Sequence, residues 1–249
     1  MLSIPATVAM SLPGSAAVVG AGAALALGTL GWGLFAPQSR MFGHVTSHGS
    51  REGPPRAALT FDDGPWPGST DVILDALRAH HVKAAFFIIG RYGRQWPDLV
   101  RRIHAEGHLI GNHTFDHHRL GLFRGRCYWH AQIAAADDAI ANITGSRPRL
   151  FRPPMGFKSP QLVLSAKCLG HQIVAWSRRG RDGIATTPQR IIQSLAGTVG
   201  AGDVVLLHDG RDPGSRRDVT ATAIALPAVI SAVCDRGISF VRLDELLGV

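Results

Sequence analysis

The stretch Thr60–Pro65, which reads TFDDGP, is the part of the chain from which both the fold and a site can be predicted. It follows the apolar and β-branched run that starts at Ala57, a composition typical of a buried strand, and its Gly-Pro pair ends such a strand. Asp62 and Asp63 are therefore expected at the carboxyl end of a buried strand. Two bare carboxylates at one strand end are unfavourable unless a cation or a proton transfer compensates. A solvated Asp-Gly turn is the alternative for the isolated stretch.

From residue 57 onward, short apolar runs alternate with segments of helical periodicity. Such runs are typical of strands buried on both faces. The alternation predicts a parallel α/β sheet, open or closed into a barrel, whose site lies at the carboxyl ends of the strands. The predicted strands are 57–61, 84–89, 108–111, 150–152, 171–176, 203–207 and 238–241. The predicted helices are 71–80, 97–106, 128–143, 160–169, 188–197 and 219–235.

The N-terminal part of the chain differs in composition from the rest. Residues 1–39 contain no charged side chain, and residues 16–36 form an apolar run long enough to cross a bilayer as a helix. No basic residue precedes this run and no clear A-x-A cleavage site follows it, which favours an uncleaved anchor over a signal peptide. The prediction is a transmembrane anchor at 1–40, a linker at 41–56 and one domain at 57–249.

The overall charge narrows the class of partner. The chain has a formal net charge of +8 and an isoelectric point of about 10.4, which favours an anionic neighbour such as membrane lipid or acidic glycan. No basic stripe with interleaved aromatic residues and no nucleic-acid motif is present, so no nucleic-acid partner is expected. The three cysteines are far apart and outside any CxxC, which indicates neither a disulfide framework nor a zinc knuckle.

Ionisable side chains follow five of the predicted strands, which is hard to attribute to chance. Among them, His113 and His117 are four residues apart, a spacing that puts both imidazoles on one face of a helical turn. With Asp63 they would form a three-ligand metal site that leaves a position open for water. The pair alone is also compatible with surface or core histidines.

The motifs TFDDGP, HTFDH, RPPMG and LLHDG, in this order, resemble the polysaccharide deacetylase domain, also called the NodB-homology domain or carbohydrate esterase family four. The phrases GNHTFDH and FFIIG are similar to that family too, and the resemblance covers about residues 55–245. It implies a distorted (β/α) barrel of about seven strands with one divalent metal at its carboxyl rim. The implied activity is hydrolysis of N-acetyl groups on an acetylated aminosugar, giving acetate and a free amine.

The resemblance also implies roles for the residues that match the family motifs. Asp63, His113 and His117 would hold the metal, with Zn expected first and Co, Mn or Ni as alternatives. Asp62 would be the general base, oriented by Arg152. The remaining roles fall to His208 as general acid, Asp182 as its partner, Met155 as backbone donor to the oxyanion, and Leu206 as the wall of the acetyl pocket.

Two positions depart from the family pattern. Met155 stands where the family usually has Tyr, which alters how a sugar packs there. The segment 176–183 reads WSRRGRDG where the family commonly shows W-D-x-D-x-x-D-W, so Ser177 and Arg179 replace two acidic residues. The arginines at 178, 179 and 181 suit a phosphate or carboxylate on the substrate, or form a solvated rim.

The expected partner is an envelope glycan, a polysaccharide or a lipid-linked sugar, at a cell membrane contacted through residues 16–36 in a single pass. The side of the membrane is left open, because Arg40, Arg51 and Arg56 favour the cytoplasm whereas glycan-modifying enzymes more often act outside. An O-acetyl esterase or a deformylase on the same scaffold is the alternative enzyme. The alternative of another class is a catalytically silent, membrane-bound glycan-binding protein.

Overall fold

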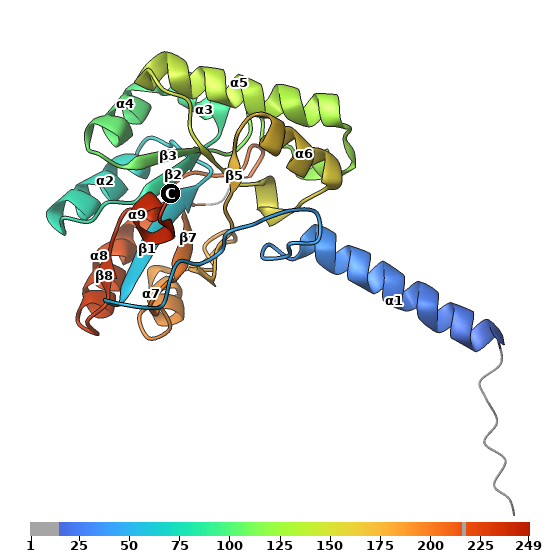
Figure 1. Cartoon of the computed structure of the whole chain (residues 1–249). Helices are drawn as coiled ribbons and strands as arrows, with labels where there is room; N and C mark the ends of the chain where they lie inside the picture. The colour runs from blue at the N-terminus through green and yellow to red at the C-terminus, as the bar shows by residue number, and fades with distance from the viewer. Residues whose placement is uncertain (1–14, 216–217) are drawn as a thin grey trace, which may run out of the picture.

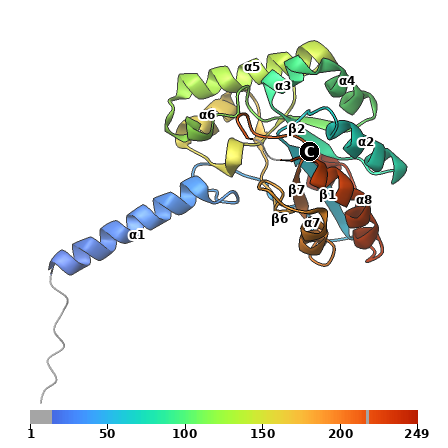
Figure 2. The same cartoon turned by 180° about the vertical axis from the view of Figure 1, so that it is seen from behind.

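The computed structural model describes residues 15–215 and 218–249, and its main feature is a curled parallel sheet surrounded by helices (Figures 1 and 2). Within these residues the sheet has eight strands in the order β5-β4-β3-β2-β1-β7-β6, and β8 pairs with the beginning of β1. All of its strand pairs are parallel. The strands are β1 (Arg56–Asp62), β2 (Ala85–Ile88), β3 (Leu109–Asn112), β4 (Leu150–Phe151), β5 (Gln172–Ile173), β6 (Arg178–Arg179), β7 (Val204–His208) and β8 (Ser239–Phe240).

The parallel α/β prediction is confirmed, and the barrel is less complete than expected. In the part of the chain that the structure describes, no strand pairing joins β5 to β6, so the sheet is a half-barrel rather than a closed ring. All seven predicted strands are present, and β6 is an additional strand that the prediction missed.

The six helices predicted after residue 57 are all present, with ends shifted by at most two residues. The short helices α3 and α9 and two 3₁₀ segments were not predicted. The helices are α1 (Ser15–Phe35), α2 (Thr70–Ala79), α3 (Gly90–Gln95), α4 (Pro97–Ala105), α5 (Arg126–Thr144), α6 (Pro160–Cys168), α7 (Pro188–Leu195), α8 (Thr220–Cys234) and α9 (Leu243–Leu247), and the 3₁₀ segments are η1 (Arg119–Phe123) and η2 (Pro154–Gly156).

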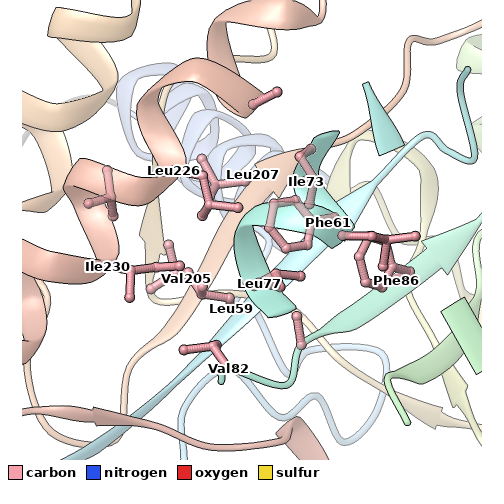
Figure 3. Packing of buried hydrophobic residues seen from close by; sticks show 14 of the residues in the cluster. Leu59, Phe61, Ile73, Leu77, Val82, Phe86, Val205, Leu207, Leu226 and Ile230 are labelled. Atoms are coloured by element: carbon pink, nitrogen blue, oxygen red, sulfur yellow. The ribbon is translucent and has the colours of Figure 1, made fainter. Parts of the chain in front are cut away.

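The alternation of side chains along β1 explains how one strand serves both core and site. Leu59 and Phe61 point to the helix layer, where they pack with residues of α2 and α8 such as Ile73 and Leu226 (Figure 3). Each such buried side chain contributes about 1.5–3 kcal/mol to folding. The alternate positions face the inside of the half-barrel, and Asp62 is the last of them. A strand buried on both faces therefore delivers its final carboxylate to the inside of the half-barrel.

Residues 41–56, expected to be a linker, lie against the sheet. Val45 is buried, Thr46 bridges to Val174 beside β5, and His48 bridges to Asp203 just before β7. The segment therefore connects two separate parts of the half-barrel.

Helix α1 projects from the rest of the molecule, and its last turn is held by one loop (Figures 1 and 2). The Lys158 backbone N–H donates to the carbonyl of Leu34, and its ammonium donates to the carbonyls of Ala36 and Pro37 at 2.7 and 2.8 Å. None of the helices in the described ranges is long and apolar enough to cross a membrane. The transmembrane anchor predicted at 16–36 is therefore not confirmed.

Candidate active site

The carboxyl ends of β1, β3 and β7 and the loops after β4 and β6 surround a cavity of about 500 Å³. The residues singled out from the sequence converge on this cavity from distant segments. Asp62 and His208, for example, are 146 positions apart in the chain but directly adjacent in the β1–β7 register. Arg152 lies beneath the cavity and is fully buried. Those that line it are Asp62, Asp63, His113, His117, Met155, Asp182, Leu206 and His208.

Asp63, His113 and His117 form a buried cluster that fits a metal ion. Asp63 Oδ1 lies 3.5 Å from His113 Nε2 and 3.3 Å from His117 Nε2. Donor atoms about 2.1 Å from a tetrahedral ion lie about 3.4 Å from one another, which agrees with both distances. Burial raises the pKa of Asp63, but His117, His113 and His208 outweigh it and hold that pKa well below its usual range. The cluster therefore stabilises negative charge on the one oxygen ligand.

The backbone of these residues is not helical, so the helical-turn explanation of the histidine spacing was wrong. Thr114 and His117 have φ angles of 64° and 51°, and Asp63 has 71°, all in the left-handed region that non-glycine residues disfavour. Local bonds hold this conformation, because Asn112 Oδ1 accepts from the Thr114 N–H at 2.7 Å. The imidazole rings still lie close together, with centroids 4.8 Å apart. Tertiary contacts rather than helix geometry bring the ligands together.

The second ring nitrogen of each histidine is also bonded. The Nδ1–H of His113 donates to the carbonyl of Arg152 at 2.7 Å, and the Nδ1–H of His117 donates to Asp212 at 2.9 Å. This leaves Nε2 of both rings as the atom that can bind a metal, and such partners fix the tautomer and strengthen the ligand. Burial lowers the pKa of His117, while Asp63 and Asp212 raise it above its ordinary value.

Asp212 is a site residue that the sequence analysis missed. It lines the same cavity and also pairs with Arg119. The only sequence signal was a further acidic residue in the Gly- and Pro-containing loop that follows His208.

Asp62 is held by the arginine beneath it. Arg152 Nη1 donates to Asp62 Oδ1 at 2.7 Å and to the hydroxyl of Thr60 at 2.9 Å, while its other nitrogens donate to two backbone carbonyls. Its guanidinium also lies 4.0 Å from the ring centroid of Phe87. Burial lowers the pKa of Arg152, and Asp62 acts in the opposite direction. Arg152 thus holds Asp62 through Oδ1, and Asp62 Oδ2 lies 3.8 Å from His113 Nε2.

A second carboxylate–histidine pair lies across the cavity. Asp182 Oδ1 lies 3.0 Å from His208 Nδ1, and Asp182 Oδ2 accepts from the His208 backbone N–H and from the hydroxyl of Thr222, both at 2.7 Å. Burial raises the pKa of Asp182, but His208 and these bonds lower it below its usual value. The imidazole is therefore held by an ionised carboxylate. Thr222 was not predicted as a site residue, because it lies in a mostly apolar helix.

Met155 and Leu206 complete the wall. Leu206 is 5% exposed, whereas Met155 is 45% exposed and has a φ of 57°. A side chain at the next residue, Gly156, would come within 2.7 Å of the Trp176 ring, so only glycine fits there. The tight packing of Gly156 constrains the backbone next to Met155.

Comparisons with known proteins show the family of the chain. The family model for polysaccharide deacetylase matches residues 49–174. A chitooligosaccharide deacetylase from Bradyrhizobium is 35% identical over 216 residues, which cover 83% of this chain and 97% of that protein. The structure of the Bc1960 peptidoglycan N-acetylglucosamine deacetylase is 31% identical with a TM-score of 0.75, covering 82% of this chain and 92% of that one. A family 4 carbohydrate esterase from Streptomyces lividans is also 31% identical, with a TM-score of 0.67 and coverage of 75% and 91%. The family expected from the motifs is thereby confirmed, and the chain belongs to the polysaccharide deacetylases.

Proposed function

We propose that this chain is a metal-dependent hydrolase that removes N-acetyl groups from an acetylated aminosugar glycan. The observation that carries the proposal is the meeting of two different carboxylate–histidine groups in one cavity, with Asp62 between them. The similarity to a chitooligosaccharide deacetylase and a peptidoglycan N-acetylglucosamine deacetylase supports acetylated glucosamine units as the substrate class.

Asp63, His113 and His117 would hold the metal ion. One oxygen and two imidazole nitrogens suit Zn first, and Co, Mn or Ni as alternatives. When bound, such an ion lowers the pKa of water toward about 7 and polarises a carbonyl.

The protein's own groups then carry the proton transfers. Asp62, fixed by Arg152, accepts the proton of the water that adds to the acetyl carbonyl carbon. The Met155 backbone N–H donates to the oxyanion that forms, and Leu206 contacts the acetyl methyl group. As the C–N bond breaks, His208 in its protonated form gives a proton to the leaving amine, and Asp182 holds the imidazolium in place. The products are acetate and a free amine.

The test is acetate release from N-acetylated chitooligosaccharides before chelation, after chelation and after metal is restored. Activity should disappear with the metal and return with it. The variant His113→Ala should lose both metal and activity, whereas His118→Ala, a nearby exposed histidine outside the cluster, should keep both. Full activity after exhaustive chelation, with metal analysis showing none bound, would contradict the mechanism.

The same assay separates the alternatives. Formate in place of acetate would indicate a deformylase, and acetate only from O-acetylated substrates would indicate an esterase. A metal-loaded protein that binds glycan without releasing any acid would be the catalytically silent binding protein. The location at the cell membrane stays a prediction, which fractionation of the producing cells would test.

A further inference from the structure

Two arginines at the edge of the cavity stand on a rigid support. Arg179 ends β6, and β6 pairs with β7 so that Arg179 is in register with Leu206. The next residue, Gly180, donates its N–H to the Leu206 carbonyl at 2.9 Å, and a side chain there would lie 2.4 Å from Leu207. Arg181 follows with a φ of 58°. The backbone that carries both arginines is thus fixed to the strand that supplies His208.

These arginines separate the active-site cavity from a second one. Arg179 and Arg181 line the cavity of about 500 Å³ that contains the metal-ligand cluster. They also line a neighbouring cavity of about 730 Å³ above α7, together with Thr186 and Arg190. A glycan longer than one sugar that extends from the first cavity to the second must pass these two guanidinium groups.

The charges of the cavity are otherwise matched. Among the described residues, each acidic side chain that lines it has a cationic or histidine partner: Asp62 has Arg152, Asp63 has His113 and His117, Asp182 has His208, and Asp212 has His117 and Arg119. Arg178, on the opposite face of the strand, is paired with Asp203 at 2.9 Å.

Arg179 and Arg181 differ from all of these. Both side chains are exposed, and neither has a hydrogen bond or an ion pair to any residue in 15–215 or 218–249. Each offers a planar set of donors, which matches the two oxygens of a carboxylate or a phosphate better than it matches sugar hydroxyls.

We infer that the substrate glycan carries a phosphate or carboxylate group, which Arg179 and Arg181 bind while the acetamido group lies over the metal-ligand cluster. This inference rests on the proposed deacetylase function and specifies its substrate. A carboxylate would come from an acidic sugar, and a phosphate from a phosphorylated or lipid-linked sugar.

The experiment compares three matched chitooligosaccharide series of two to five sugars: neutral, with a 1-phosphate, and with the terminal sugar oxidised to a carboxylate. Varying the length changes the distance between the anion and the acetyl group that is removed. At one length or more, kcat/KM for an anionic series should exceed that for the neutral series by about tenfold, as expected for charge-assisted hydrogen bonds at an exposed site. The advantage should shrink as salt is added. A preference for the carboxylate series would indicate an acidic sugar, and a preference for the 1-phosphate series would indicate a phosphorylated or lipid-linked sugar.

The variant R179Q/R181Q should lower the ratio of anionic to neutral kcat/KM about tenfold. The control R78Q/R101Q removes the same charge from exposed faces of α2 and α4, away from both cavities, and should leave that ratio unchanged. If the neutral series releases acetate and neither anionic series is a better substrate, this inference is overturned and the proposed function stands. The same conclusion follows if R179Q/R181Q leaves the ratio of anionic to neutral kcat/KM unchanged. No acetate from any series with metal bound would overturn both.

Discussion

The cleft contains arginines in two contrasting regions, its floor and its rim. Arg152 on the floor is fully buried and bonded to Asp62, Thr60 and two carbonyls, whereas Arg179 and Arg181 on the rim are exposed with no partner among the described residues. A buried cation must be fully paired because it has lost its water, so Arg152 belongs to the protein's own geometry. An exposed cation retains its donors for a ligand. Burial, rather than residue type, distinguishes a positioning arginine from a binding one.

The largest effect on activity is expected from removing the carboxylate of Asp62, which Arg152 on the floor holds in place. The variant Asp62→Asn keeps the shape and a hydrogen-bond acceptor for Arg152 but cannot take a proton. Acetate release should fall by about 10²–10⁴-fold, the usual contribution of a general base. Metal content should stay near that of the wild type, whereas the melting temperature should fall, because Arg152 loses its buried counter-charge. Turnover within a few-fold of wild type would remove Asp62 from its assigned role.

The buried Arg152–Asp62 pair is also expected to matter for the free energy of unfolding. Arg152→Met leaves Asp62 buried without its cation, which should lower the free energy of unfolding by about 3–5 kcal/mol. The double variant R152M/D62N, which has no unpaired buried charge, should regain part of that loss but no activity. Denaturant titration measures both.

The matching change on the rim, Arg179→Met, should alter stability by no more than about 0.5 kcal/mol. Equal losses for Arg152→Met and Arg179→Met would contradict the distinction between floor and rim.

A smaller effect is expected from the residue that orients a metal ligand. Asp212→Asn weakens the acceptor of the His117 Nδ1–H, and changes of this kind typically cost about 10–100-fold in metal affinity. Competition with a chelator of known affinity measures it, and excess metal should restore much of the activity. Asp116→Asn, which changes the acidic residue next to His117 in the loop after β3 and lies outside the cavity lining, is the control. Unchanged metal affinity in Asp212→Asn would limit that residue to a role in the loop.

A histidine outside the cleft is expected to make the fold less stable in acid, independently of the chemistry of the site. Burial, with Lys83 nearby, lowers the pKa of His108 from 6.5 to about 4. Between these values the unfolded chain binds more protons than the folded one, so stability is complete above pH 6.5 and falls as the pH drops toward 4. The contribution is at most about 3 kcal/mol.

His108→Gln, which keeps an acceptor for the Ala84 N–H, should flatten this part of the pH–stability curve. Identical slopes for the variant and the wild type between pH 6.5 and 4 would contradict the assignment.

Most elements could be predicted because their apolar runs are long or strongly periodic. β6 could not, since its two residues are both arginines, and α3 reads GRYGRQ, which has no apolar face. Both are placed by tertiary contacts rather than by their own sequence.

The site was predictable as a set of strand ends, because parallel strands deliver their last residues to one edge. Its finer geometry was not. The positions of the His113 and His117 rings depend on bonds to Arg152 and Asp212 in other segments, and Asp212 is 95 residues away from the histidine it contacts. No local pattern carries such information.

The clamp that Lys158 places on the end of α1 has a practical consequence for protein production. The same clamped region includes Gln38, whose side chain donates to the Trp176 carbonyl at 2.9 Å, and Pro37, which packs on Gly156 beside Met155. A shortened gene that begins at residue 57, where the sheet begins, would still encode every predicted catalytic group. Its product would lack Pro37 and Gln38, which contact the cavity-lining segments at Gly156 and Trp176, so a recombinant version should begin upstream of Trp32.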